Sequence, residues 1–521
     1  MERKYVLTID CGTQSIRSLI FDNQGKLVVK SKKEFPEYKR PKENWVEADP
    51  EMFWEYLVDV VKETKEIEPE IFGKIKGISV TTQRDTVIIL DKNNKPLRNA
   101  IMWMDTRKTD KPKKMKSWAN ILLKLVRFKE NAEKFNKECK GHWIEKEEPD
   151  IWNKTKKYIL LSTYLNYKLT GKLVDSKASM IGHIPFDYKN QKWSGKYDIK
   201  NQIFQIDRNM LPDVVDPGKE IGRITEETEK LTGLMKGLPL IASGSDKGCE
   251  TIGTGTIDLT SGSISLGSQA TIQTTSKKYF ELRKLFPPFT AVRPGYYNPE
   301  INIYRGYWMV KWFEEEFAHE ELKIANGDTN KALNILNGKL DQIPPGAEGL
   351  ILQPYWGKEL MRPEAKGSII GFSDKHNKIH IYRAIIEGIG FALLEGIEKI
   401  EKKSKVRMKK LAISGGGSQS DSICQISADI FNREIYRVQT HETSGLGAAI
   451  ATFVGLNEFE NFEEAMDSMI HYSRVFKPDQ KNAKIYKDII NKGYKNLYKR
   501  LRPIYKELDN ITNIQQAGDL K

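Results

Sequence analysis

The sequence predicts an α/β protein with two similar domains, and three observations support this fold class. The chain has 521 residues, which is more than one ordinary hydrophobic core accommodates. Its N-terminal region has the pattern of three strands, a helix and a further strand. A second strand–turn–strand segment of similar sequence lies near the middle of the chain.

The first strands are short apolar runs separated by turn residues. Tyr5–Asp10 and Ile16–Phe21 are joined by Cys11-Gly-Thr-Gln-Ser15, and Asp22-Asn-Gln-Gly25 makes a second turn before Lys26–Val29. β-branched and apolar residues bounded by Gly, Asn and Asp are typical of a meander of three antiparallel strands.

A helix and a strand follow this meander. Asp49-Pro50 suits the start of a helix, because proline is accommodated in the first turn. Ile75–Val80 then returns to a strand pattern. Three strands, a helix and a strand is the order of a ribonuclease-H-like α/β domain. The apolar residues at helical spacing are Phe53, Trp54, Leu57, Val58 and Val61.

A partial repeat suggests that this domain is duplicated. Gly12-Thr-Gln-Ser15 aligns with Gly267-Ser-Gln-Ala270, an offset of 267 − 12 = 255 residues, and each copy lies between two strand-like runs. An alignment of four residues is weak support for a repeat by itself, but the strand context strengthens it. We expect domains at residues 1–245 and 246–521, with polar helices from Asn457 onward and a frayed tail after Asn510.

Composition argues against several other classes of protein. The formal charge is +14, but 84 Lys and Arg are interspersed with 70 Asp and Glu, and the densest basic stretch, Lys108–Lys116, contains no nucleic-acid-binding motif. The four cysteines form no Cys-x-x-Cys pair, which argues against a disulfide framework or a zinc site. Charged residues interrupt the apolar run Ile381–Ile400. We therefore expect a cytoplasmic protein that binds neither nucleic acid nor membrane.

The two matching turns are candidate phosphate loops. Small residues let backbone N–H groups approach phosphate oxygens without obstruction by Cβ. Gly12, Thr13 and Ser15 could do this in the first turn, and Gly267 and Ser268 in the second; each is otherwise an ordinary hairpin turn. Asp10, at the end of its strand, would suit a Mg²⁺ ion held directly or through water.

Two further segments have the context of a site. Gly415-Gly-Gly-Ser418 follows the apolar run Leu411–Ser414 and precedes a helix expected over Asp421–Phe431. Asp246 lies between two glycines just beyond an apolar strand. Phosphoryl transfer needs a carboxylate that accepts the proton of the attacking hydroxyl, and Asp246 could be that base. It could equally be the N-cap of a helix.

In order and spacing, these and other motifs over about residues 4–456 resemble the FGGY carbohydrate kinases. Gly244-Ser-Asp246 matches the position of the family's catalytic Asp. Near the N-terminus the matching motifs are Ile9–Arg17, Gln83-Arg-Asp85, Trp103-Met-Asp-Thr-Arg107, Leu169-Thr-Gly171 and Asp175–Ser179. Further on they are Arg362–Gly367, Tyr382–Gly388, Gly415–Ser420 and Gly445-x-Gly-Ala-Ala449.

The resemblance implies two ribonuclease-H-like domains of the actin and sugar-kinase superfamily, with a cleft that binds ATP, Mg²⁺ and a ketose or polyol. It implies that Asp246 is the general base. The residues implied to face the sugar are Gln83, Arg84, Asp85, Trp103, Asp105 and Asp246. Those implied around the nucleotide and its phosphates are Gly12, Thr13, Ser15, Arg17, Gly267, Ser268, Gly306, Gly416 and Ser420.

The resemblance leaves the substrate open. Gln83-Arg-Asp85 is similar to the Gln-Arg-Glu motif of glycerol kinases, but those enzymes place Gln directly after the catalytic Asp, where this chain has Lys247. The Asp-Asn-Ala pattern of xylulose kinases is also missing from the sequence. A xylulose-type sugar or related polyol is the first expectation and glycerol the second. The alternatives are an actin-like or chaperone-like ATP switch and a kinase that has lost turnover; a homodimer is compatible with all of them.

Overall fold

The computed structural model describes residues 3–356, 362 and 364–518, so Pro363 of the Arg362–Gly367 motif lies outside the described residues. The chain divides into two compact units. Unit 1 comprises residues 1–257, 275–299 and 442–470, and unit 2 comprises residues 258–274, 300–441 and 471–521. The boundary expected between residues 245 and 246 lies within unit 1 and remains a proposal.

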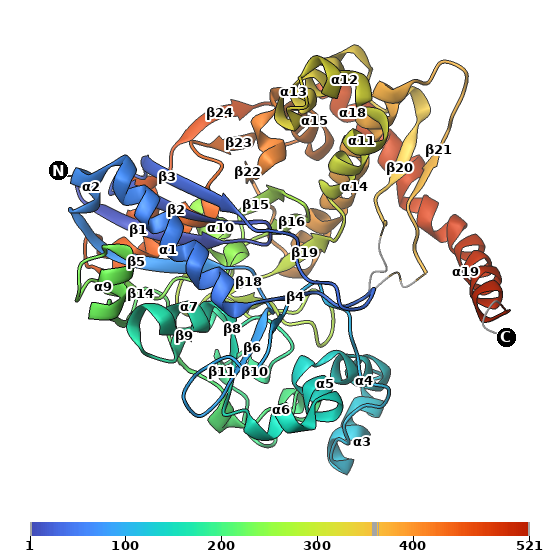
Figure 1. The fold of residues 1–521 in the computed structure, drawn as a ribbon. Helices are drawn as coiled ribbons and strands as arrows, with labels where there is room; N and C mark the ends of the chain where they lie inside the picture. The colour runs from blue at the N-terminus through green and yellow to red at the C-terminus, as the bar shows by residue number, and fades with distance from the viewer. Residues whose placement is uncertain (1–2, 357–361, 363, 519–521) are drawn as a thin grey trace. The chain divides into compact units, whose positions relative to one another are not determined.

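Unit 1 is built on a six-stranded sheet (Figure 1). The expected meander forms its β1–β2–β3 part, and β1, β5 and β14 are parallel neighbours. The helix expected after Asp49 is α1 (Pro50–Ile67), and the Asp49 side chain caps it by accepting the N–H of Glu51. The strands in order are β13 (Glu220–Arg223), β14 (Pro239–Ile241), β5 (Ile75–Thr82), β1 (Tyr5–Cys11), β2 (Ser15–Asp22) and β3 (Leu27–Glu34).

Alternation along β1 separates the two faces of this sheet. Leu7 and Ile9 pack in one apolar cluster with Phe53 of α1. Side chains of alternate residues point to opposite faces, so Thr8 and Asp10 belong to the other face. There α16 (Thr443–Gly455) and α10 (Asp246–Gly253) pack against the sheet. The side chain of Asp10 is thus directed to the side on which Asp246 begins α10.

Unit 2 has a sheet of the same plan. β15 and β16 form the expected strand–turn–strand, β19 continues it antiparallel, and β22 and β23 are parallel to β15. The helix expected after the glycine cluster is α15 (Asp421–Phe431). The strands in order are β19 (Glu300–Ile303), β16 (Ala270–Gln273), β15 (Ser261–Leu266), β22 (Lys410–Ser414), β23 (Ile435–Val438) and β24 (Tyr472–Phe476).

The duplicated ribonuclease-H-like fold is confirmed by the two sheets. Each has three antiparallel strands in sequence order, then two parallel strands beside the first, then one antiparallel edge strand. The two turns differ by one residue, since Cys11 pairs with Ile16 whereas Leu266 pairs with Ala270.

The C-terminal region differs from the expected run of polar helices. α17 (Phe462–Met469) belongs to unit 1, and Tyr472–Phe476 is the edge strand β24 of unit 2. Most of β24 is solvent-exposed, as an edge strand can be, so its sequence lacks the apolar alternation that identifies a strand. After α18 (Gln480–Ile489), the helix α19 (Lys495–Gly518) continues through Asn510, where we expected the chain to fray.

Within the described residues, no helix is long and apolar enough to cross a membrane. The longest apolar candidate of the sequence is α14 (Lys378–Ser404), whose mostly buried surface includes Arg383 and Glu387 joined by an ion pair. The helix is therefore part of the core of unit 2.

The crossing of α10 and α16 explains Gly447 of the Gly445-x-Gly-Ala-Ala449 motif and Gly253 of α10. A Cβ on Gly447 would lie 1.8 Å from the carbonyl oxygen of Cys249, and one on Gly253 would lie 2.0 Å from that of Thr443. Backbone atoms cannot give way as a flexible side chain does. The two helices can approach this closely only because both positions lack a side chain.

We expect Gly447→Ala to lower the free energy of unfolding by about 3 kcal/mol, because the added methyl group forces the two helices apart. Urea denaturation followed by circular dichroism would measure the change. Gly338→Ala is the matched control: Gly338 lies in the helix α13 (Thr329–Lys339), its added Cβ meets open space, and alanine is the better helix former. Equal stability changes in both variants would contradict the steric explanation.

Candidate active site

The carboxyl ends of three adjacent parallel strands bring the unit 1 candidates together. Asp10 is in β1, Gln83–Asp85 directly follow β5, and Asp246 follows β14 through a short loop. The Thr81 hydroxyl donates to the carbonyl of Gly244 at 2.9 Å, and Gln83 N–H donates to the Cys11 carbonyl at 2.9 Å. In open α/β sheets, ligands bind outside this end of the strands.

Asp246 is the first residue of α10 and not its cap. The cap is Ser245, whose hydroxyl accepts the N–H of Gly248 at 3.3 Å. The Asp246 carboxylate accepts its neighbour's backbone N–H at 2.7 Å, and Nε of Arg84 lies 4.0 Å from Oδ1. Burial raises the pKa of Asp246, although the positive charges of Arg84 and Lys247 oppose the shift. A carboxylate with a raised pKa is a stronger proton acceptor.

Lys247 has a partner in its own helix. Its Nζ donates to Oε2 of Glu250 at 2.7 Å, and Glu250 is buried. The ammonium group is therefore directed along α10, one turn beyond Asp246. This arrangement accounts for a lysine directly after the candidate base.

Asp10 lies in a cluster of charges on the same face of the sheet. Arg17 on β2 donates from Nη1 to Oδ2 of Asp10 at 2.9 Å, and its Nε lies 3.5 Å from Glu442. Burial raises the pKa of Asp10 to about 6; Arg17 opposes this shift, while the charges of Glu442 and Asp246 add to it.

This cluster is compatible with a divalent cation. The described residues contain no group of three or more His, Cys, Asp or Glu placed to hold a metal ion by themselves. Mg²⁺, however, is usually bound by one or two carboxylates together with substrate phosphates and water. Two carboxylates near Asp10 disfavour its ionisation, so a cation beside it would relieve their repulsion.

Thr13 connects the first turn to two expected sugar-side residues. Its hydroxyl accepts the indole N–H of Trp103 at 2.9 Å and donates to Oε1 of Gln83 at 3.3 Å. The N–H of Gly12 closes the turn by donating to the carbonyl of Ser15 at 3.0 Å. The side chain of Thr13 thus fixes Trp103 and Gln83.

The carboxylate of Asp105 is enclosed by protein groups. It accepts hydrogen bonds from Nε and Nη2 of Arg107 at 2.9 and 2.7 Å, and from the N–H of Val46 at 2.6 Å. Arg107 also donates to Glu47 at 2.8 Å. The side chain of Asp105 is therefore buried in an ion-pair network next to the turn that carries Trp103.

Asp85 is held by two residues that the motifs did not include. Its Oδ2 lies 3.0 Å from Nζ of Lys140 and 2.7 Å from Nδ1 of His183, and Oδ1 accepts the N–H of His183 at 3.0 Å. Burial favours the neutral carboxyl, but Lys140 and His183 outweigh it and hold the pKa of Asp85 well below its usual range. Asp85 also has a positive φ of 53°, an uncommon conformation for a residue other than glycine.

Five of the candidates around the nucleotide and its phosphates lie in unit 2. The carbonyls of Gly267 and Ser268 accept the N–H groups of Tyr307 and Trp308 at 3.0 and 3.2 Å, at the start of α11 (Trp308–Phe317). A Cβ on Gly306 would lie 2.3 Å from the backbone N of Ala270. The second turn and the Gly306 segment are therefore in close contact.

The third glycine cluster joins this group. A Cβ on Gly415 or on Gly417 would lie 2.9 Å from atoms of Leu266, the residue before the second turn. At Gly416, in contrast, an added Cβ would meet nothing within 4 Å. Ser420 caps α15 by accepting the N–H of Ile423 at 3.4 Å. Gly416 is thus the open position of an otherwise packed set of glycine segments.

The sequence motifs do not include Glu442, Lys140 or His183. Glu442 precedes α16 and pairs with Arg17 and Lys30. Its place just before the Gly445-x-Gly-Ala-Ala449 motif could have marked it as a candidate site residue. Lys140 begins the helix α5 (Lys140–Glu147), outside the matching motifs, and His183 lies in a loop without a recognised pattern.

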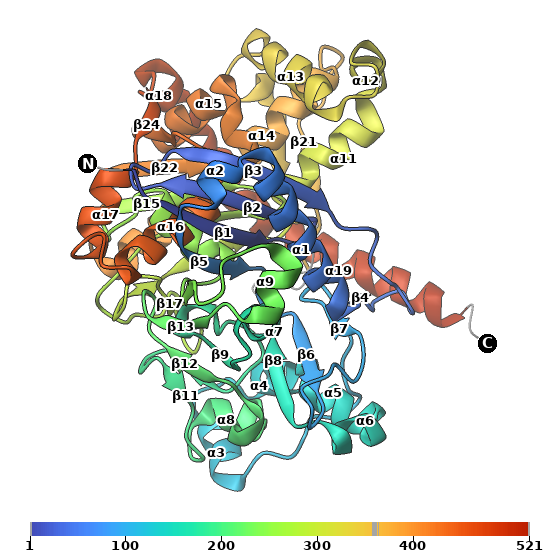
Figure 2. The same cartoon turned by 60° about the vertical axis from the view of Figure 1, so that its left-hand side comes forward.

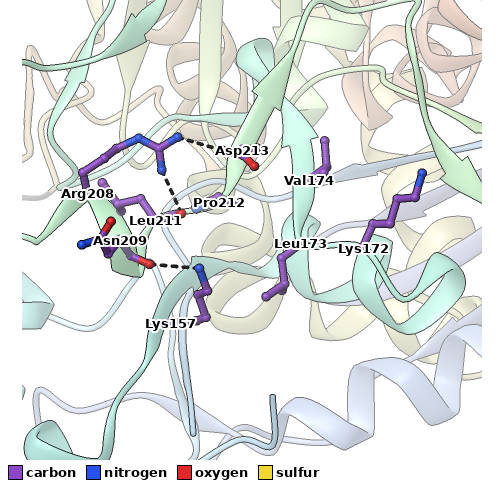
Figure 3. Close-up of a pocket in the computed structure, with 9 residues that line it drawn as sticks. All are labelled: Lys157, Lys172, Leu173, Val174, Arg208, Asn209, Leu211, Pro212 and Asp213. Atoms are coloured by element: carbon purple, nitrogen blue, oxygen red, sulfur yellow. Dashed lines mark hydrogen bonds and ion pairs between the residues drawn. The ribbon is translucent and has the colours of Figure 1, made fainter. Parts of the chain in front are cut away.

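A separate pocket of about 650 Å³ lies elsewhere in unit 1 (Figure 3). Lys157 and Arg208 line it, but both contact other lining residues: Lys157 donates to the carbonyl of Asn209 and Arg208 pairs with Asp213. None of the candidate site residues lines it. It does not coincide with the ends of the parallel strands.

Comparison with known proteins matches both halves of the chain to one family. Residues 5–253 match the N-terminal domain, and residues 262–456 the C-terminal domain, of the FGGY family of carbohydrate kinases. A xylulose kinase of Lactococcus lactis is 29% identical over 97% of this chain and 98% of its own length. A glycerol kinase of Thermococcus gammatolerans is 28% identical over 96% and 98%. The crystal structure of a xylulose kinase from Lactobacillus acidophilus has a similar fold, with a TM-score of 0.81 at 22% identity over 97% of this chain and all of that one.

Proposed function

The chain belongs to the FGGY family of carbohydrate kinases and is a sugar phosphotransferase, and from this premise we propose that it phosphorylates a hydroxyl of a ketose or polyol with Asp246 as general base. The observation that carries the proposal is the meeting of Asp246 and Arg84 at the ends of β14 and β5. A nucleotide switch needs neither a base nor a sugar-side motif. The intact pair likewise argues against a kinase that has lost turnover.

The proposed acceptor side consists of Gln83, Arg84, Asp85 and Trp103. Arg and carboxylate groups hydrogen-bond sugar hydroxyls, and the indole ring supplies an apolar wall. We propose that Asp105 does not contact the sugar directly, because its carboxylate already accepts hydrogen bonds from Arg107 and Val46. It instead stabilises the turn that presents Trp103. A xylulose-type substrate is supported by the names of several relatives, and glycerol by others.

In the proposed reaction, the acceptor hydroxyl gives its proton to the Asp246 carboxylate as its oxygen attacks the γ-phosphorus of ATP. The bond between that phosphorus and the β,γ-bridging oxygen breaks, and ADP leaves with the electron pair. The raised pKa of Asp246 favours the proton transfer. Arg84 keeps the base oriented from 4.0 Å and donates to the hydroxyl of Ser245 at 3.2 Å.

We propose that the backbone at the tip of the first turn and Arg17 face phosphate oxygens from unit 1. Gly267, Ser268, Gly306, Gly416 and Ser420 are proposed as the nucleotide side of unit 2. Family membership implies ATP and a divalent metal ion; Mg²⁺, with Asp10 as the residue that would hold it, is our assignment. When bound, the ion would neutralise charge on the phosphates.

A substrate panel tests the proposal. The purified chain is expected to release ADP in a saturable manner with one or a few ketoses or polyols, and mass spectrometry of the product should show one added phosphoryl group. D-Xylulose and glycerol are the two most informative members. Preference for glycerol would establish the second candidate substrate. ADP release that no member of a broad panel stimulates would contradict sugar phosphorylation and favour the switch.

A further inference from the structure

The helix α3 (Ser117–Leu125) carries an apolar stripe that the fold of unit 1 does not bury. Ile121, Leu122 and Leu125 are 59, 43 and 77% exposed, and Trp118 is partly exposed. These four residues are spaced i, i+3, i+4 and i+7, so they form one continuous face of the helix. Four large apolar side chains on one face form a patch, unlike single exposed apolar residues, which are common.

A different face of α3 holds it in the unit. Ala119 and Leu123 are fully or almost fully buried in a small core with Phe128 and Ile203. At 100° per residue these two positions are centred well over 90° from the exposed stripe. The helix is therefore packed against unit 1 through another face, and the exposed stripe is not needed for that packing. Figures 1 and 2 agree that α3 is at the end of unit 1 remote from its six-stranded sheet.

Basic residues surround the stripe. Residues 108–129 contain eight Lys and Arg and one acidic residue, Asp110. In the part of the chain that the structure describes, the exposed Lys114, Lys116, Lys124 and Arg127 make no ion pair with an acidic group. Exposed Tyr197 adds an aromatic ring 5.5 Å from Nζ of Lys116. The surface around α3 thus combines apolar, aromatic and positively charged groups.

We propose that α3 attaches the protein to an anionic lipid bilayer, lying in the interface with Trp118, Ile121, Leu122 and Leu125 among the acyl chains and the Lys and Arg groups among the head groups. Apolar residues on one face with Lys and Arg beside them are the pattern of interfacial helices. Tryptophan and tyrosine favour the same depth. The sequence led us to expect no membrane partner because no segment can span a bilayer, but surface attachment needs no span.

The positive charge around α3 favours an anionic bilayer over a second copy of the chain. A twofold contact through α3 would place the same cations of both copies against one another. An anionic bilayer instead offers the opposite charge, contributing about a fivefold gain in binding for each Lys or Arg near the surface. A bilayer also accommodates the convex stripe without a complementary groove.

Vesicle flotation with the full chain tests the proposal. The protein is expected to float with phosphatidylcholine vesicles containing about one third phosphatidylglycerol, to remain behind with pure phosphatidylcholine, and to detach as salt rises to about 0.5 M. Ile121→Ser/Leu125→Ser should weaken binding at least about tenfold. Lys124→Glu/Arg127→Glu should weaken it by a similar factor or more.

Matched controls alter exposed groups on unit 2, with Ile324→Ser/Ile504→Ser for the apolar change and Lys331→Glu/Lys492→Glu for the charge change. These controls should bind as the unaltered chain does, and all variants should keep kinase activity. No flotation with anionic vesicles, or equal losses in the controls, would overturn the proposal. Light scattering that shows a dimer lost only in the α3 variants would assign the stripe to a second copy instead.

Discussion

Replacing Asp246 by Asn is expected to lower kcat by about 10³-fold while leaving ATP affinity within about threefold, because the amide keeps the shape but accepts no proton. The partly exposed carboxylate begins α10 beside Arg84, where we propose that it accepts the proton of the acceptor hydroxyl. Turnover by coupled ADP detection and nucleotide binding by calorimetry measure the two quantities. Because the pKa of Asp246 is raised, kcat of the unaltered chain should also fall as the pH drops through that pKa.

Ser245→Ala separates chemistry from helix capping. It removes the hydroxyl that caps α10, with a loss of about 1 kcal/mol of stability, but keeps the Asp246 carboxylate. Its kcat should fall by no more than about tenfold. If Asp246→Asn retained full turnover, or if Ser245→Ala lost as much, Asp246 would not be the base.

Local patterns predicted the parts of the site that lie on one strand–turn or strand–loop–helix segment. The meander, the two turns and the position of Asp246 after β14 follow from runs of apolar residues ended by small ones. Sequence alone left Asp246 as base or cap, because Ser245 and Asp246 are both good caps. Only the backbone geometry assigns the cap to Ser245.

Tertiary contacts determine what the sequence did not predict. Asp85 is paired by Lys140, 55 residues away, and by His183, 98 residues away. No periodicity or motif connects such positions in one sequence. Asp105 is a different case, because its partner Arg107 is only two residues away. The Asp-x-Arg spacing was therefore compatible with an ion pair, but only the packing of Glu47 and Val46 around it shows that the pair is buried.

Replacing Lys140 by Met is expected to lower the free energy of unfolding at neutral pH by about 3 kcal/mol, because it leaves a largely buried carboxylate without its ammonium partner. Lys140 is buried in α5 (Lys140–Glu147), and the Asp85 side chain is only 14% exposed. Urea denaturation measures the loss. Since Asp85 is proposed to face the acceptor, KM for the sugar should rise about tenfold or more, with a smaller change in kcat.

The loss should depend on pH in a definite direction. The pKa of Asp85 is depressed in the folded protein, so its ionic stabilisation is present above the unfolded value of about 4 and is lost as the pH falls through the folded value. In Lys140→Met the carboxylate is easier to protonate. The difference in stability between the two proteins should therefore be largest near pH 7 and shrink below about pH 4.

A double-variant cycle separates this pair from general damage to α5. Asp85→Asn/Lys140→Met leaves neither charge unpaired, so it should be more stable than the sum of the single losses predicts. Lys113→Met is the matched control, since Lys113 pairs with Glu145 at 2.6 Å but both side chains are about one-third exposed, and such pairs contribute at most about 1 kcal/mol. Additive losses in the cycle, or an equal loss in Lys113→Met, would contradict a buried pair that fixes Asp85. Coupling without a rise in KM would instead limit the pair to a structural role and remove Asp85 from the acceptor site.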